Sequence, residues 1–255
     1  MNSVAVVTGG ASGLGLAVVN RFVEEGFAVA IVDISEEKGA VMAKQLSDQG
    51  KNVYFFHADV SKQENAKQVA NRIKQELGSI DILVNAAGII HRTKSVDLTE
   101  EKLKKLLDIN LNGTVFMSQA VQPHMSLSGG GAIVNFGSML AHYGSKNLLA
   151  YAASKGAVIQ ITKCLAVDWA QFNIRVNAVS PGYIETPLAS GATQNPVFRE
   201  RVLSKTPQNR FGTPDEVAVA IHFLCSKDAS FITGVDLPID GGLLAGDPSL
   251  FPPAS

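Results

Sequence analysis

Cysteine is scarce in this chain of 255 residues, which contains only Cys164 and Cys225. Small scaffolds held by disulfides need several cysteines, and metal sites need ligands at short, regular spacing, which these two do not have. The histidines His57, His124, His142 and His222 also lie far apart in the sequence. We therefore expect no metal site, and we interpret both cysteines as small buried hydrophobic side chains in a reducing compartment.

Long hydrophobic runs and an excess of one charge are also missing. No run approaches the roughly 18 apolar residues of a membrane-spanning helix, and no basic segment precedes the first apolar run as in a signal peptide. Lys and Arg number 22 and Asp and Glu 23, so the chain lacks the surplus of positive charge that nonspecific binding to nucleic acid requires. We expect a cytoplasmic protein that binds neither membranes nor nucleic acid.

Short apolar runs that alternate with helical patterns dominate the chain. Most runs are continuous and rich in Val and Ile, which is typical of strands covered on both faces. The predicted strands are residues 4–7, 28–32, 53–56, 80–84, 132–136, 174–179 and 235–239. The predicted helices are residues 14–25, 36–49, 61–77, 100–125, 150–172 and 214–224. This alternation predicts an α/β chain with a single-domain Rossmann fold over residues 1–255, in which helices flank a doubly wound, seven-stranded parallel sheet.

Two segments depart from the alternation. Residues 182–213 form a long polar stretch with three prolines, and such an excursion in a compact domain often covers the substrate as a lid. The tail at residues 246–255 contains three more prolines, and we expect it to be irregular.

A glycine-rich segment joins the first predicted strand to the first predicted helix. It reads Thr8-Gly9-Gly10-Ala11-Ser12-Gly13-Leu14-Gly15. Glycines let the backbone turn tightly and approach a pyrophosphate, and the start of the helix supplies free N–H groups. A simple turn is the alternative, but the strand–turn–helix setting favours a dinucleotide site.

The second predicted strand ends near Asp33, which lies 20 residues after Gly13. A carboxylate at this place accepts hydrogen bonds from the adenosine ribose and repels a 2′-phosphate. The sequence therefore predicts NAD as the cofactor rather than NADP. Asp59-Val60 and Asn85-Ala86-Ala87-Gly88 follow the third and fourth strands; from the residues alone they fit the crevice and ordinary turns equally well.

A possible acid/base pair lies near the start of a predicted helix, where Tyr151 and Lys155 are four residues apart and share one face. A phenol, with a pKa of about 10 in model peptides, acts as a base near neutral pH only if its pKa is lowered. We expect Lys155 and an oxidised nicotinamide to lower it. Ser138 ends the fifth strand and can bond the reacting oxygen, while Asn110 is an amide among apolar neighbours that needs a partner. The Tyr-x-x-x-Lys spacing also occurs on ordinary amphipathic helices.

Together these residues resemble the short-chain dehydrogenase/reductase family in its single-domain branch, over nearly the whole chain. The matching motifs are Thr8-Gly9-x-x-x-Gly13-x-Gly15, Asp59, Asn85-Ala86-Ala87-Gly88, Asn110, Ser138, Tyr151-x-x-x-Lys155 and Pro181-Gly182.

The resemblance implies an NAD-dependent alcohol dehydrogenase or carbonyl reductase that assembles as a homotetramer, with helices 100–125 and 150–172 in one interface. It implies that Tyr151 is the general acid/base, that Lys155 holds the nicotinamide ribose, that Ser138 orients the substrate carbonyl and that Asn110 holds a relay water. It further implies that the cofactor contacts are Gly9, Ser12, Gly13, Leu14, Gly15, Asp33, Ile34, Asp59, Val60, Asn85, Ala86, Gly88, Tyr151, Lys155, Pro181, Gly182, Ile184 and Thr186.

The substrate is less defined. The run Gly88-Ile89-Ile90-His91-Arg92-Thr93 and the segment after Pro181 resemble the branch that interconverts gluconate-type sugar acids and their keto forms. For such a substrate, Ser138 and Tyr151 are predicted to contact the reacting oxygen and Leu188 the chain, and a cation such as Arg92, His91 or Arg199 to bind the carboxylate. A surface role for Arg92 stays open. So do a dehydrogenase of neutral secondary alcohols, diols or cyclic ketones, and a non-catalytic NAD(H) sensor.

Overall fold

The computed structural model describes residues 3–186 and 195–248, and its centre is one seven-stranded sheet. All strand pairs are parallel, in the order β3-β2-β1-β4-β5-β6-β7. The strands are β1 (Val4–Thr8), β2 (Ala28–Asp33), β3 (Val53–His57), β4 (Ile82–Asn85), β5 (Gly131–Phe136), β6 (Ile174–Pro181) and β7 (Asp236–Ile239). The predicted fold class is confirmed.

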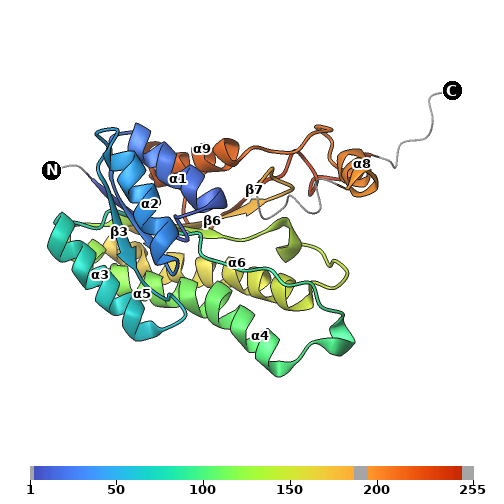
Figure 1. Cartoon of the computed structure of the whole chain (residues 1–255), viewed down its shortest axis with the longest axis horizontal. Helices are drawn as coiled ribbons and strands as arrows, with labels where there is room; N and C mark the ends of the chain where they lie inside the picture. The colour runs from blue at the N-terminus through green and yellow to red at the C-terminus, as the bar shows by residue number, and fades with distance from the viewer. Residues whose placement is uncertain (1–2, 187–194, 249–255) are drawn as a thin grey trace.

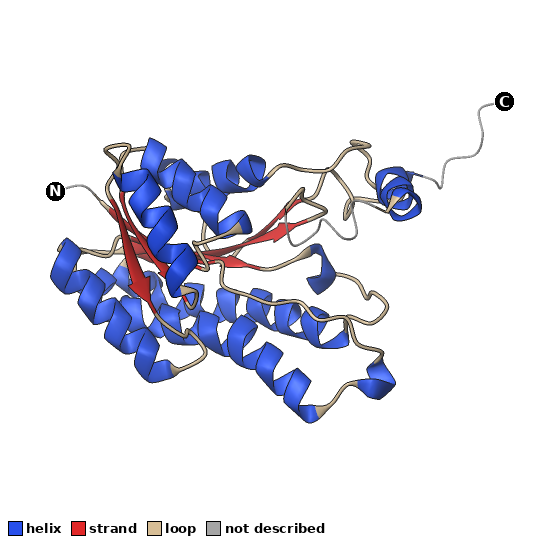
Figure 2. Cartoon of the chain, viewed as in Figure 1, coloured by secondary structure: helices blue, strands red, loops and turns tan. Residues whose placement is uncertain are grey.

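Two layers of helices cover the sheet (Figure 1, Figure 2). On one face lie α1 (Gly13–Glu24), α2 (Glu36–Ser47) and α9 (Pro214–Cys225), which pack on a core that includes Phe22. On the other lie α3 (Gln63–Leu77), α5 (Gly113–Leu127) and α6 (Leu149–Trp169), with Phe56 and Met117 in the core. The central strands are buried on both faces, as their continuous apolar runs predict, whereas the edge strands β3 and β7 keep exposed positions.

The strand order reverses beside β1, which pairs with β2 on one side and with β4 on the other. The loops after β1 and β4 lead to helices on opposite faces of the sheet, and in such sheets ligands bind in a crevice outside the carboxyl ends of the strands at this point. The glycine-rich segment follows β1, and Asp33 ends β2. The topology thus brings the predicted cofactor residues to one place.

The helix predicted over residues 100–125 is wrong in one respect, because the structure divides it. Helix α4 (Glu100–Leu107) is followed by a π turn over Asp108–Asn112 and then by α5. The amide of Asn110 makes two hydrogen bonds to the backbone of Ile89, so the wide turn accommodates a side chain that is bonded inward. Single π turns of this kind are frequent at functional sites.

The prediction that both cysteines are buried is wrong for Cys164, which lies exposed on α6. The helical period turns this position away from the sheet, while Thr162 two residues earlier is buried. Cys225 at the end of α9 is half-buried, and burial raises the pKa of its thiol to about 12.

The described part of the predicted lid is more regular than its composition suggests. It contains α8 (Pro196–Lys205), which begins with a proline and whose cap Asn195 accepts a hydrogen bond from the Phe198 N–H. Residues 187–194 of the lid and 249–255 of the tail lie outside the described residues. Beyond α8, Thr213 and Glu216 form the capping box of α9, and this helix begins at residue 214, as the sequence predicts.

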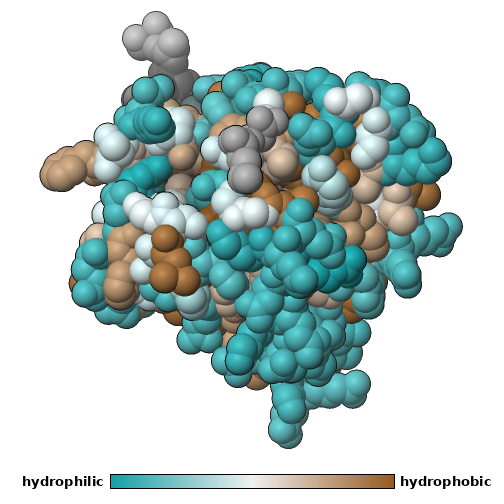
Figure 3. All heavy atoms as spheres, turned by 90° about the vertical axis from the view of Figure 1, so that its left-hand side faces the viewer, coloured by the Kyte–Doolittle hydropathy of each residue, from teal (hydrophilic) through white to brown (hydrophobic). Residues whose placement is uncertain are grey.

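The surface at the β3 edge is mostly polar. Figure 3 views the molecule from the side where β3 and α3 lie in Figure 1, and hydrophilic residues cover most of its lower part, with hydrophobic atoms in separate patches. Among the helices that the structure describes, none combines the length and hydrophobicity that crossing a membrane requires.

Candidate active site

The glycine-rich loop after β1 is closely packed on one side and open on the other. A Cβ atom on Gly15 would lie 2.2 Å from the Gly9 carbonyl oxygen, and one on Gly9 would lie 2.8 Å from the Ala87 Cα. At Gly13, with φ +56°, no atom of the described residues lies within 4 Å of the position that a Cβ would take. Since Gly13 begins α1, the open space lies at the positive end of that helix. This is the cradle that a pyrophosphate requires, so the chain fits a dinucleotide.

The carboxylate of Asp33 is fixed beside this loop. Its Oδ2 accepts the Ala11 N–H at 3.1 Å, and its Oδ1 accepts the Ser35 N–H at 2.9 Å. Each carboxylate oxygen can accept more than one hydrogen bond, so both can still accept from ribose hydroxyls. Ile34 beside it is largely exposed at the rim of the crevice, and Ser12 makes no side-chain cap to α1.

The opposite wall follows β4. The Ala87 N–H donates to Thr8 Oγ1 at 3.1 Å, which joins this segment to the end of β1. The amide of Asn85 is buried and donates to Asn135 Oδ1 at 2.9 Å and to Ser118 Oγ at 3.0 Å. Its side chain therefore holds β4, β5 and α5 together inside the protein, beneath the crevice.

Further predicted contacts frame the crevice. Asp59 Oδ1 accepts the N–H and hydroxyl of Ser61, and Val60 is buried beside Gly113. Pro181 ends β6, and the N–H of Gly182 donates to the Ile239 carbonyl at 2.9 Å. The remaining predicted contacts in the described chain are half-buried Leu14, Ala86 and Thr186, exposed Gly88, and buried Ile184. Ile184 pairs with Gly212 in an isolated bridge.

Asn110 and Lys155 lie beside Gly88, and Tyr151 lies beside Lys155. The Lys155 ammonium lies 5.8 Å from the centroid of the Tyr151 ring, so the two residues share a helix face as the spacing predicts. A Cβ on Gly88 would lie 3.3 Å from Asn110 Oδ1 and 3.9 Å from Lys155 Nζ. Asn110 donates to Ser154 Oγ at 3.2 Å in addition to its two bonds with Ile89, which satisfies the predicted need for partners.

Burial controls the charges in this cluster. Lys155 is buried, donates to the Phe136 carbonyl at 2.6 Å, and burial lowers its pKa to about 8. Burial raises the pKa of the Tyr151 phenol, and a hydrogen bond with the Ser138 side chain lowers it. Desolvation of the phenolate is thus the largest effect on the Tyr151 pKa. The lowering expected from Lys155 together with an oxidised nicotinamide stays a prediction.

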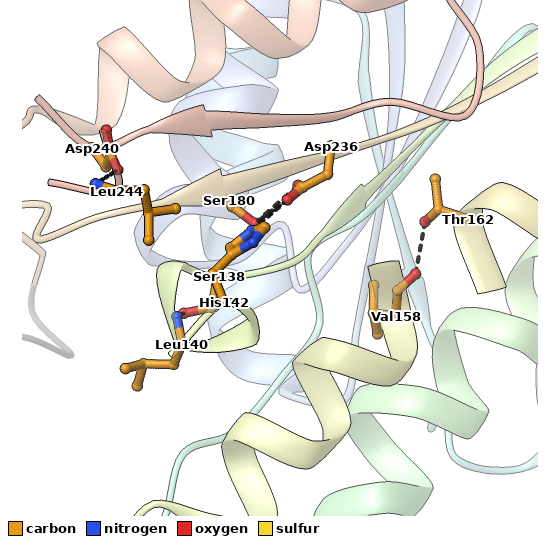
Figure 4. Close-up of polar contacts among 9 residues, drawn as sticks. All are labelled: Ser138, Leu140, His142, Val158, Thr162, Ser180, Asp236, Asp240 and Leu244. Carbon is orange, nitrogen blue, oxygen red and sulfur yellow. Dashed lines mark hydrogen bonds and ion pairs between the residues drawn. The ribbon is translucent and has the colours of Figure 1, made fainter. Parts of the chain in front are cut away.

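Ser138 lies close to Tyr151 at the start of a short 3₁₀ turn, η3 (Met139–Ala141). Its hydroxyl accepts the Leu140 N–H at 3.1 Å and caps the turn (Figure 4). Met139 and Leu140 form an apolar cluster with Tyr151 and Tyr183. Leu243 and Leu244, from the segment that follows β7, belong to the same cluster. Asp240 holds this segment in place, because its carboxylate accepts the N–H groups of Gly242 at 2.9 Å and Leu244 at 2.8 Å. The beginning of the C-terminal segment therefore lines the site.

A cavity of about 440 Å³ adjoins this cluster on the side of α8. Its lining includes the phenols of Tyr143 and Tyr183 and the cations Arg201 and Lys205. The pKa of Tyr143 is raised to about 12 by burial, by Tyr183 and by Asp240. Burial raises the pKa of Tyr183 and the charge of Arg92 lowers it, which places the exposed Arg92 near this phenol.

The three cations predicted for a carboxylate have different surroundings. Arg199 stacks at 4.7 Å over the ring of Phe211 and lies 3.7 Å from Glu185, so it is engaged elsewhere. His91 and Arg92 are exposed, and Leu188 lies outside the described residues. Tyr143, Tyr183 and Arg201 were not predicted from the sequence, and no spacing pattern connects them.

The comparisons with known proteins agree with this geometry. Residues 9–244 match a family described as enoyl-(acyl carrier protein) reductase. The chain is 40% identical over 94% of its length to a 3-oxoacyl-(acyl-carrier-protein) reductase of Thermotoga maritima, of which 97% is covered. It is 41% identical, over 94% of its length and 93% of the relative, to an NAD-dependent glycerol dehydrogenase of Listeria innocua.

A solved structure also matches. A gluconate 5-dehydrogenase from Burkholderia cenocepacia, crystallised with NADP and tartrate, superposes with a TM-score of 0.93, at 34% identity and with 96% of each chain covered. Fold, site geometry and relatives together show that the chain belongs to the short-chain dehydrogenase/reductase family, as an oxidoreductase of alcohol and ketone substrates with a nicotinamide cofactor.

Proposed function

We propose that this protein is an NAD-dependent dehydrogenase that interconverts a secondary alcohol and a ketone on a gluconate-type sugar acid. The observation that carries the proposal is the meeting of Tyr151, Ser138, Lys155 and Asn110 beside the glycine-rich crevice. A sensor that binds NAD(H) without turnover has no need of such an acid/base cluster.

Each side chain has one task. Tyr151 takes the proton of the substrate hydroxyl in oxidation and returns it in reduction. Ser138, hydrogen-bonded to Tyr151, orients the same substrate oxygen. Lys155 holds the nicotinamide ribose and places a positive charge beside the phenol, while Asn110 keeps the surrounding loop in place and supports a water that relays protons. When bound, NAD supplies the hydride acceptor and a positive ring that favours the phenolate.

Asp33 supports NAD over NADP. Its carboxylate lies at the end of β2 and is bonded to the glycine loop, where it accepts from the ribose hydroxyls and repels a 2′-phosphate. The Burkholderia gluconate 5-dehydrogenase was crystallised with NADP, and kinetics with both cofactors distinguish the two.

Asp33→Ala is expected to raise KM for NAD⁺ by roughly 10- to 100-fold, because hydrogen bonds to a charged group are lost. KM for NADP⁺ should fall, because the repulsion is removed. Steady-state kinetics with both cofactors measure this, with Asp48→Ala as the control, since Asp48 is an exposed carboxylate at the end of α2 paired only locally with Lys44. A variant that keeps the NAD⁺ preference contradicts the role of Asp33.

The sugar-acid substrate rests on the cavity beside Tyr183. Phenol hydroxyls suit a polyol chain, and guanidinium groups suit a carboxylate. Among the described residues, Arg199 and Lys205 form ion pairs with carboxylates, whereas Arg201 and Arg92 form none. Arg201 and Arg92 are therefore the candidates to bind the carboxylate of a substrate. The tartrate bound to the Burkholderia gluconate 5-dehydrogenase is also a hydroxy acid.

Arg92→Ala and Arg201→Ala are each expected to raise KM for a sugar acid about tenfold and to leave KM for a neutral alcohol unchanged, because only the acid loses an ionic contact. The measurement compares both substrates in each variant. Arg72→Ala on α3, which removes an exposed arginine paired with Glu76, is the matched control. Equal effects on the two substrates would refute a carboxylate site.

The apolar cluster around Leu140, Leu243 and Leu244 supports a second candidate, a dehydrogenase of neutral alcohols, diols or cyclic ketones. The glycerol dehydrogenase among the relatives belongs to this class. The deciding experiment measures NADH formation from NAD⁺ over a panel of sugar acids, polyols and secondary alcohols. Turnover of gluconate-type acids supports the main proposal, and turnover confined to neutral alcohols replaces it by the second. NADH binding without any turnover in the panel contradicts both.

A further inference from the structure

A chain of polar contacts links the segment after Ser138 to the last two strands of the sheet. His142 Nε2 lies 2.7 Å from Asp236 Oδ2, and Ser180 Oγ lies 2.9 Å from both oxygens of the same carboxylate (Figure 4). Ser180 is fully buried, and the Asp236 side chain is only 8% exposed. Because a carboxylate only accepts, His142 Nε2–H and the Ser180 hydroxyl both donate to it.

The order of these groups excludes a nucleophilic triad. In such a triad the imidazole lies between the serine and the carboxylate, so that it can take the hydroxyl proton. Here the carboxylate lies in the middle and Ser180 is buried away from solvent. The contacts therefore join elements: Ser180 belongs to β6, Asp236 to β7, and His142 comes directly after η3.

The turn η3 connects this contact directly to Ser138. The Ala141 N–H donates to the Ser138 carbonyl at 2.9 Å, and the His142 N–H donates to the Met139 carbonyl at 3.0 Å. At the other end, Gly137 N–H donates to the Val179 carbonyl at 2.8 Å. Ser138 thus lies inside a short segment that is attached to the sheet on both sides, by Gly137 before it and by His142 after it.

The attachment through His142 matters because of the chain that follows it. Residues 142–147 are all exposed, with Tyr143 at the edge of the cavity, so the chain beyond η3 packs less closely than Met139 and Leu140. The His142–Asp236 contact stands at the boundary between this exposed stretch and the buried Met139 and Leu140. The imidazole donates whether it is neutral or charged, so the contact does not require protonation of His142.

We propose that His142 is a positioning residue, whose bond to Asp236 holds the η3 turn so that the Ser138 hydroxyl stays directed at Tyr151. The inference rests on the proposed role of Ser138 in the reaction. His142 itself does not touch the reacting atoms, and its effect on turnover passes through Ser138.

The first test is a double-mutant cycle with the panel substrate that the wild-type enzyme turns over fastest. His142→Ala is expected to lower kcat about tenfold, as for the loss of one hydrogen bond to a charged group, with KM for NAD⁺ unchanged. In a Ser138→Ala background the same change should have almost no further effect, because coupled residues are not additive. His142→Gln, which keeps a donor, should restore much of the loss.

A second measurement is independent of turnover. Amide hydrogen exchange measured by mass spectrometry should be faster in the peptide containing Leu140, Ala141 and His142 for His142→Ala than for the wild type. His124→Ala is the matched control, because its Nε2 contacts Asn71 at 3.0 Å on the exposed side of α5. It should change neither kcat nor the exchange of that peptide.

The outcomes separate this inference from the proposed function. Ser138→Ala with normal kcat contradicts the catalytic role of Ser138, and exchange alone then decides whether His142 holds the turn. If Ser138→Ala lowers kcat and the effects of Ser138→Ala and His142→Ala on kcat are additive in the double mutant, the inference is wrong. The proposed function is then unaffected. Unchanged exchange in His142→Ala overturns it as well.

Discussion

Tyr151→Phe is expected to lower kcat by about three orders of magnitude in both directions, within the range by which general acid–base catalysis accelerates reactions. The change removes only the hydroxyl, so the ring keeps its place beside the Lys155 ammonium at 5.8 Å and in the apolar cluster with Leu140. The Kd for NADH should change little, because the substitution removes one hydroxyl and leaves Lys155, Asp33 and the glycine loop in place. Turnover is measured by absorbance of NADH, and Kd by its fluorescence.

The matched control is Tyr54→Phe, which removes the hydroxyl of an exposed tyrosine on β3 and should leave kcat unaltered. If Tyr151→Phe retains more than about a tenth of the wild-type kcat, a different group transfers the proton, and the mechanism proposed for the cluster is wrong.

Gly15→Ala is expected to weaken NADH binding by about 100-fold or more, the second large effect. The added Cβ would lie 2.2 Å from the Gly9 carbonyl oxygen and 2.8 Å from its carbon. Backbone atoms cannot move aside as a flexible side chain can, so the loop must shift and its N–H groups leave the pyrophosphate position. Overpacking of this kind costs about 1–3 kcal/mol of stability, and a loop displaced by about 1 Å loses several aligned hydrogen bonds worth about 1.5–3 kcal/mol each.

Thermal denaturation and NADH titration distinguish the two consequences of this substitution. Gly144→Ala adds the same methyl group at a place where no atom of the described part of the chain lies within 4 Å, and it should change neither Tm nor Kd. A Gly15→Ala protein that is folded and binds NADH with the wild-type Kd would show that the glycine loop does not hold the cofactor.

Much of the fold can be predicted from local sequence patterns. Continuous Val- and Ile-rich runs predict strands that are buried on both faces, and the structure confirms this for β1 and β4. The edge strands β3 and β7 are predicted from similar apolar runs but are partly exposed. How far a strand is covered depends on its position in the sheet, which its own sequence does not give. The helix start predicted at residue 214 is confirmed. Its capping box depends on Thr213 and Glu216, which are only three residues apart.

The helix over residues 100–125 and the burial of Cys164 could not be predicted correctly for the same reason. The π turn at Asp108–Asn112 depends on the contact between Asn110 and Ile89, which are 21 residues apart. Whether Cys164 faces the sheet or solvent depends on how α6 is rotated against it, and α6 has apolar residues on most sides.

Spacing along single elements is enough to establish the β-α alternation, the glycine loop and the shared face of Tyr151 and Lys155. Packing between distant elements establishes how Asp236 meets His142 across 94 residues and how Leu243 and Leu244 reach Tyr151. It also makes burial the largest influence on the pKa of the Tyr151 phenol. Such contacts and desolvation depend on which surfaces the helices and the sheet bring together, and no local period encodes that.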